Sequence, residues 1–238
     1  MYGMSDSALL RLWELSLTQH PIDLALSILS AAEPDCAWET LTELSIGERD
    51  RRLLRVRQQT FGDRLAARAD CPACAAALEL DLSASALMLP PADETAPLIF
   101  EYEGITTAYR LPNSRDLAAI IGCADADSGQ AVLLNRCVLS DASPELLPAG
   151  AAQALADEMA RRDPQAEIEF TLECPSCGAN YTMLFDILSY LTVEITVEAK
   201  RVLREIHHFA RHYGWREADV LALSRARRMG YLELMANE

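Results

Sequence analysis

Two cysteine pairs with the same spacing are the residues of this chain best suited to specific chemistry. Each pair reads Cys-Pro-x-Cys, with Cys71 and Cys74 in the first copy and Cys174 and Cys177 in the second. A Cys-x-x-Cys turn presents two sulfurs on one side, and structural zinc sites often use four thiolates. The two pairs therefore predict one structural Zn²⁺ ion, held jointly by segments far apart in the chain.

The residues around the pairs indicate short strands. EIEFTLE alternates polar and apolar residues before the second pair, and β-forming residues follow both pairs. Strand, Cys-Pro-x-Cys, strand is the pattern of a zinc-ribbon knuckle. Gly178 follows the second pair and can adopt a positive φ, which lets the turn amides point at the thiolates. Ala75 occupies the equivalent position in the first copy and makes that turn less ideal.

A redox function is the alternative for the same motif. Cys-Pro-x-Cys also occurs at thioredoxin-like sites, where the start of a helix lowers the pKa of the first thiol. Strands rather than helices are expected after both pairs here, and a single redox site needs one copy. The pattern therefore favours zinc over a thiol oxidoreductase.

Composition and charge limit the classes of partner. The chain has 238 residues, a formal net charge of −15 and a pI near 4.7. Such a charge argues against binding nucleic acid or an anionic membrane, both of which need a basic surface. No signal-peptide pattern opens the chain, and no apolar run approaches the ~20 residues of a membrane span. We expect a protein of the bacterial cytoplasm, free or incorporated in an assembled particle.

The hydrophobic pattern predicts an α+β fold that is mainly helical. The segment LTVEITV alternates like a strand, but the pairs Glu194/Glu198 and Arg201/Glu205 continue a polar face at helical spacing, so a helix is favoured. One zinc ion would bring the two ends of the chain together as a helical subdomain on a split four-cysteine zinc ribbon. The expected parts are an N-terminal helical part (1–62), a first knuckle half (63–87), an insertion with helices and a hairpin around Glu103-Gly104 (88–164), a second knuckle half (165–187) and a C-terminal helical part (188–238).

Other chemically capable side chains give weaker indications. His208 and His212 have a spacing that could hold a metal, but no carboxylate motif accompanies them or His207, so a solvated or partner-facing stripe is expected. A solvated helix face is also the expectation for Arg225, Arg227 and Arg228. The three remaining cysteines are expected to be small core residues; these are Cys36, Cys123 and Cys137.

Aromatic residues near the C-terminal helix break are candidates for partner binding. These are Tyr213, Trp215 and Tyr231, since aromatic side chains often anchor protein interfaces, although ordinary core packing is the alternative. No nucleophile elbow, phosphate-binding loop or dinucleotide fingerprint occurs in the sequence. We therefore expect a protein that is not an enzyme.

The order of several motifs resembles a known family. The motifs IGERDRRLL and CPAC come first, followed by LPNSRDL, CPSCG and HYGWREADVLALS. This order is similar to that of the baseplate hub assembly chaperones of T-even-type contractile-tailed phages and related contractile injection systems. The resemblance implies a non-enzymatic assembly chaperone or minor baseplate component, with hub, spike or other baseplate proteins as partners. A zinc-ribbon adaptor for nucleic acid or transcription machinery remains the alternative, and a thiol oxidoreductase a further one.

Overall fold

The computed structural model describes residues 3–91, 97–139 and 150–236, and these form an α+β fold that is mainly helical. The helices are α1 (Asp6–Ser16), α2 (Pro21–Ala32), α3 (Trp38–Glu43), α4 (Ile46–Phe61), α5 (Ala84–Leu87), α6 (Ser114–Ile120), α7 (Ala126–Cys137), α8 (Ala151–Arg162), the 3-10 helix η2 (Pro164–Ala166), α9 (Ile187–Tyr213), α10 (Glu217–Leu221) and α11 (Arg225–Ala236). The strands are β1 (Arg64–Asp70), β2 (Ala77–Ser83), β3 (Leu98–Tyr102), β4 (Ile105–Tyr109), β5 (Ile168–Glu173) and β6 (Asn180–Phe185). They pair as three separate antiparallel hairpins, β1–β2, β3–β4 and β5–β6.

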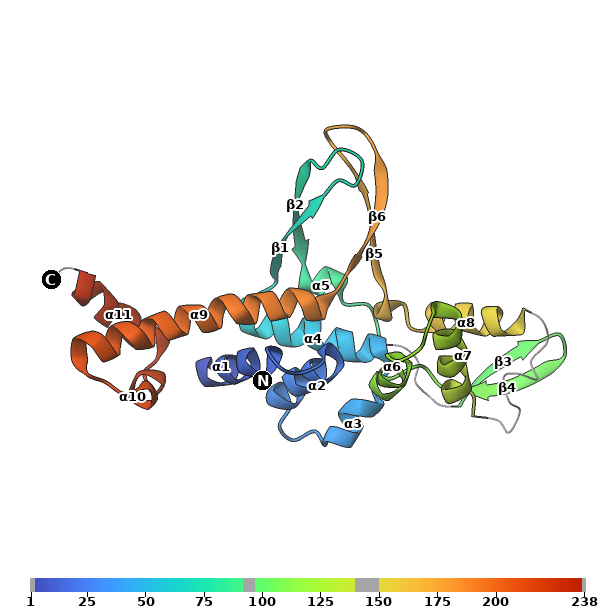
Figure 1. The fold of residues 1–238 in the computed structure, drawn as a ribbon, viewed down its shortest axis with the longest axis horizontal. Coiled ribbons are helices and arrows are strands. Elements are labelled where there is room, and N and C mark those ends of the chain that lie inside the picture. The colour runs from blue at the N-terminus through green and yellow to red at the C-terminus, as the bar shows by residue number, and fades with distance from the viewer. Residues whose placement is uncertain (1–2, 92–96, 140–149, 237–238) are drawn as a thin grey trace.

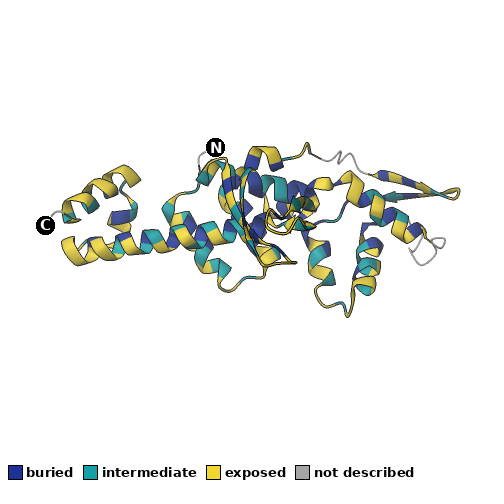
Figure 2. Cartoon of the chain, turned by 90° about the horizontal axis from the view of Figure 1, so that it is seen from above, coloured by how far each residue is buried: buried dark blue, intermediate teal, exposed yellow. Residues whose placement is uncertain are grey.

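The main core joins the first helices of the chain to the long helix α9. In Figure 1, α9 runs along α1 and α4, although more than half of the sequence separates them. Leu191 and Ile195 of α9 are buried against leucines of α1, α2 and α4. At the edge of this core, the Arg57 guanidinium makes an ion pair with Glu194 at 2.6 Å. Figure 2 shows the buried residues concentrated where these helices meet.

The alternating segment in α9 is helical, as its charge pattern predicts. Asp186 caps the start of the helix by accepting hydrogen bonds from the amides of Leu188 and Ser189. Gly214 ends it in the left-handed conformation, with φ of 67°. The exposed valines of this segment do not form a strand, because the helix buries every third or fourth residue in the main core.

The segment between the two cysteine pairs has its own small core. The predicted hairpin around Glu103-Gly104 is confirmed as β3–β4, and its side chains pack with α7 and α8. Asn113 caps the start of α6, because its side chain accepts hydrogen bonds from the amides of Arg115 and Asp116.

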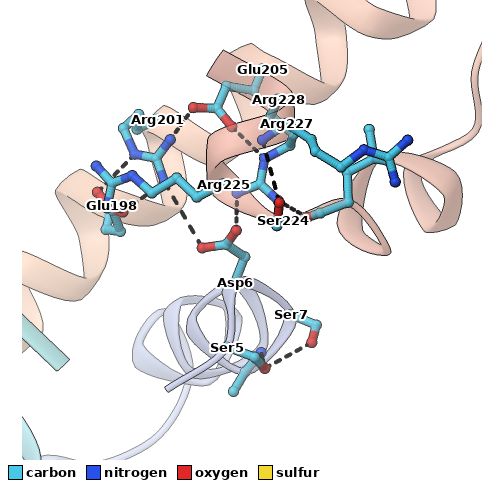
Figure 3. A network of polar contacts seen from close by, with 12 residues as sticks. Ser5, Asp6, Ser7, Glu198, Arg201, Glu205, Ser224, Arg225, Arg227 and Arg228 are labelled. Carbon is cyan, nitrogen blue, oxygen red and sulfur yellow. Dashed lines mark hydrogen bonds and ion pairs between the residues drawn. The ribbon is translucent and has the colours of Figure 1, made fainter. Parts of the chain in front are cut away.

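The last two helices fold back on the distal end of α9, and a buried ion-pair network holds them there. Arg228 of α11 contacts Glu205 of α9 and Asp6 of α1 (Figure 3). Its side chain is only 2% exposed, so the expectation of a solvated arginine face is wrong for Arg228. Pairing with two carboxylates is what allows this cation to be buried. Arg225 and Arg227 of the same helix do lie at the surface.

Candidate metal centre

The two Cys-Pro-x-Cys motifs form the turns of two hairpins that project from the helical layer. Cys71 and Cys74 lie between β1 and β2, and Cys174 and Cys177 lie between β5 and β6. In Figure 1, both hairpins rise from the base formed by α4 and α9, and their tips meet. At about 3.4 Å per residue, strands of this length place the tips about 20 Å from the helices.

The backbone has the same conformation in both turns. The amide of each first cysteine donates to the carbonyl five residues later, at 2.9 Å for Cys71 to Ala76 and for Cys174 to Ala179. The amides of Ala75 and Gly178 donate back to the first cysteine of their turn at 2.8 Å. Both residues have positive φ, 57° for Ala75 and 72° for Gly178. The two turns therefore have different residue types at this position but the same backbone geometry.

The four sulfurs lie close together with a spacing that suits tetrahedral coordination. The ligand atoms of the four cysteines all lie within 4.8 Å of one another. The contacts between hairpins are 3.8 Å for Cys71 to Cys177 and 3.7 Å for Cys74 to Cys174. Four metal–sulfur bonds of about 2.3 Å in a regular tetrahedron require sulfur–sulfur distances of about 3.8 Å. The structure thus brings together all four predicted ligands in an arrangement that fits one metal ion.

Backbone amides and neighbouring thiols make the electrostatics of the cluster uneven. Burial by itself would raise the pKa of the Cys174 thiol, but donation from the amides of Ser176 and Cys177 and from nearby thiols lowers it to about 6. The amide of Ala76 would lower the pKa of Cys74, yet the neighbouring sulfurs and burial raise it to about 12. Four thiolates this close repel one another, so a cation between them is needed for all four to ionise.

A four-cysteine shell of this kind would hold the fold together and leave no ligand position for a substrate. The two hairpins belong to separate sheets, so in the described part of the chain no strand ladder joins them. The buried cysteines Cys71 and Cys174 pack in one apolar contact group with Leu78 and the partly buried Tyr181. Tyr181 was not among the residues predicted from the sequence. The sequence feature that could have indicated it is its position four residues after Cys177, on the strand that follows the turn.

The predicted partner-binding aromatics pack together at the distal end of α9. Tyr213, Trp215 and Tyr231 contact one another and the fully buried ring of Phe209, with centroid distances from 5.1 to 6.2 Å. These contacts attach α11 to α9. Tyr213 keeps 37% of its surface exposed, so the cluster has both a packing role and an accessible edge.

The remaining candidate ligands do not join a second site. Within residues 3–91, 97–139 and 150–236, the four-cysteine cluster is the only group of three or more possible metal ligands. His207, His208 and His212 are exposed on α9, and the ring of His212 contacts the carbonyl of His208 at 3.0 Å. Cys137 is buried as predicted, whereas Cys36 and Cys123 are only partly buried.

Comparisons with known proteins add no family assignment. No protein-family model, curated protein or solved structure matches the chain. Among the residues that the structure describes, no helix has both the length and the apolar character required to cross a membrane.

Proposed function

We propose that this chain is a non-enzymatic protein-recognition scaffold, stabilised by one structural Zn²⁺ ion in a split zinc ribbon. The observation that supports this most directly is the four-sulfur cluster at the two hairpin tips, with contacts of 3.7 and 3.8 Å between hairpins. Zinc is the metal that a closed shell of four thiolates favours, and it needs no redox change to fill a structural role.

The proposed biological role is assembly of a contractile tail or contractile injection system. The chain would act as an assembly chaperone or minor component of the baseplate hub, binding hub, spike or other baseplate proteins. The support is the order of its motifs, above all LPNSRDL and HYGWREADVLALS on either side of the second cysteine pair. In the fold, the first of these motifs caps α6 and the second makes the turn between α9 and α10.

Two measurements test the proposal at separate levels. Native mass spectrometry should find one zinc ion per chain, and Cys74→Ser should lose it while Cys36→Ser keeps it. Metal-free protein whose cysteines cycle to disulfides during turnover would instead indicate the thiol oxidoreductase. For the biological role, affinity capture from the native host should recover identified tail or baseplate proteins. Capture without any tail component would contradict the hub assignment.

A nucleic-acid adaptor is the second candidate, and the exposed cations of the distal helices favour it. Lys200, Arg204 and Arg211 lie at the surface of α9, and Arg225 and Arg227 at the surface of α11. These exposed cations, of which Arg225 pairs with Glu198 at 3.4 Å, contrast with the net charge of −15. The adaptor would bind DNA or RNA with an affinity that falls steeply with salt. If no electrophoretic mobility shift of DNA or RNA is seen even at low salt, this candidate is eliminated.

A further inference from the structure

A groove of about 590 Å³ lies where three parts of the molecule meet. One side is the start of α4, another is the insertion with α6, α7 and α8, and the third is the base of the β5–β6 hairpin. The hydrogen bond from the Ile46 amide to the Pro112 carbonyl, at 3.0 Å, holds the first two parts together at its border. This hydrogen bond fixes one border of the groove.

The walls of the groove are mainly apolar. Leu117 and Leu133 of the insertion line it while remaining partly exposed. Across the groove, Leu184 of β6 is 58% exposed. Apolar side chains left accessible on facing elements form a surface that gains free energy when another apolar segment covers it.

The charged residues of the groove all have the same sign. Among the described residues that line it are four acids, Asp50, Asp163, Glu167 and Asp186, and no lysine or arginine. Asp50 already pairs with Arg49 at 2.7 Å, and Asp163 accepts the Gly47 amide. The two exposed acids of the lining are Glu167 and Asp186. The apolar walls thus adjoin a concentrated negative potential, which is complementary to a cation.

We propose that this groove binds an apolar segment of a partner protein that carries a lysine or arginine, with the cation placed against Glu167 and Asp186, which adjoin the paired residues Ile168 and Phe185 at the base of the hairpin. The proposal names the binding surface of the protein-recognition function above and rests on that function. Residues 1–2, 92–96, 140–149 and 237–238 contain no lysine or arginine. We therefore take a separate molecule as the complementary occupant.

The test uses two labelled helical peptides of leucine and alanine, identical except for one Lys or Gln near the C-terminus. Fluorescence anisotropy with the full-length protein should show at least about tenfold tighter binding of the Lys peptide. The double variant Glu167→Gln, Asp186→Asn should reduce this preference to less than about twofold. Asparagine is also a good capping residue, so the change at Asp186 removes charge and keeps the start of α9. Asp157→Asn, on the exposed surface of α8 outside the groove, is the matched charge control.

A steric pair of variants tests the apolar part of the groove. Ala160→Trp fills the groove and should weaken both peptides, whereas Ala152→Trp, exposed elsewhere on α8, should weaken neither. Thermal unfolding verifies that all variants are folded. Absence of peptide binding, equal affinity for the two peptides, or an unchanged preference in the double variant would overturn the proposal. The proposal would also be overturned if the wild type is a dimer and Ala160→Trp is a monomer, because the occupant would then be a second copy of this chain.

Failure of this proposal and failure of the tail-assembly role have different signatures. If the Lys peptide binds as expected but no tail protein is captured, the groove is correct and the biological role is wrong. If tail proteins are captured equally well by the wild type and by the double variant, and no peptide binds, the partner surface lies elsewhere.

Discussion

The backbone amide of Gly47 donates a buried hydrogen bond of 2.8 Å to the carboxylate of Asp163, across 116 residues of sequence. The contact leaves no room for a side chain, because a Cβ at Gly47 would lie 1.8 Å from Oδ1 of Asp163. It joins the start of α4 to the segment that leads into the second hairpin, and so fixes two walls of the acidic groove.

Replacing Gly47 by alanine should therefore destabilise the protein. The expected loss is about 1–3 kcal/mol in the free energy of unfolding, as for other overpacked sites. Urea unfolding monitored by circular dichroism measures it. Gly230→Ala is the matched control, since that glycine is also helical and a Cβ there would meet no neighbouring side chain within 4 Å. The control should be neutral or up to about 1 kcal/mol more stable, and equal effects at the two sites would contradict the packing argument.

Removal of the proposed zinc ion should lower stability because the site closes a long loop. Cys74 and Cys174 are 100 residues apart, and a cross-link over such a span stabilises by about 4–5 kcal/mol in the chain-entropy treatment of disulfides. Cys74→Ser or treatment with a strong chelator should reduce the free energy of unfolding by that order. Cys36→Ser should leave both metal content and stability nearly unchanged. A chelated protein as stable as the untreated one would show that the cluster does not hold the fold.

The two cysteine turns offer a reciprocal test of backbone conformation. Ala75 adopts a positive φ that glycine adopts at no steric cost, while Gly178 occupies the same position in the second turn. Ala75→Gly should raise the thermal unfolding temperature, and Gly178→Ala should lower it, each by an amount that reflects roughly 1 kcal/mol. Differential scanning calorimetry of the zinc-loaded proteins compares them. Shifts of the same sign would mean that the two turns are not equivalent.

Arg228 should be essential for attachment of α10 and α11. Truncation to methionine removes one of the two arginines, Arg228 and Arg201, that pair with Asp6 and Glu205. Because Arg201 remains, the expected cost is below the about 3–5 kcal/mol of a fully broken buried pair. Hydrogen exchange should report faster exchange across both helices. Arg227→Met, on the exposed side of the same helix, is the control and should retain wild-type protection.

Asp116 should give the insertion a specific pH dependence. Burial would raise its pKa, but hydrogen bonds from Arg110, the Asn113 amide and Arg136 outweigh burial and lower it from 3.8. A lowered pKa contributes stability that is complete above the ordinary value of 3.8 and is lost as pH falls through the folded value. Urea unfolding at successive pH values should therefore show a shallower acid loss for Asp116→Asn than for wild type. The exposed Asp127→Asn control should run parallel to wild type.

The sequence was sufficient to predict features that depend on local spacing. The cysteine turns, the hairpin at Glu103-Gly104 and the helical character of LTVEITV follow from residue periodicity and turn chemistry, and the structure confirms these elements. The four sulfurs could be predicted to converge because each turn supplies only half of a coordination shell.

Features that depend on tertiary contacts could not be predicted in the same way. The local sequence around Arg228 resembles that around the exposed Arg225 and Arg227. Only the approach of Asp6 and Glu205 makes its burial possible. Asn113 and Ser114 are both good capping residues, so the sequence alone does not decide between them as the cap of α6. The acidic groove is assembled from three segments whose proximity no spacing rule encodes.

The position of α9 in the main core has a consequence for biosynthesis. The leucines of α1, α2 and α4 leave the ribosome early, but Leu191 and Ile195, which complete their burial, follow long afterwards. At about 5–20 residues per second, the 100 residues between Cys74 and Cys174 alone take about 5–20 s to synthesise. During that interval the nascent chain exposes an apolar helical surface and lacks half of its metal ligands. Until Leu191 and Ile195 have been synthesised, this surface is available to the cell's folding factors.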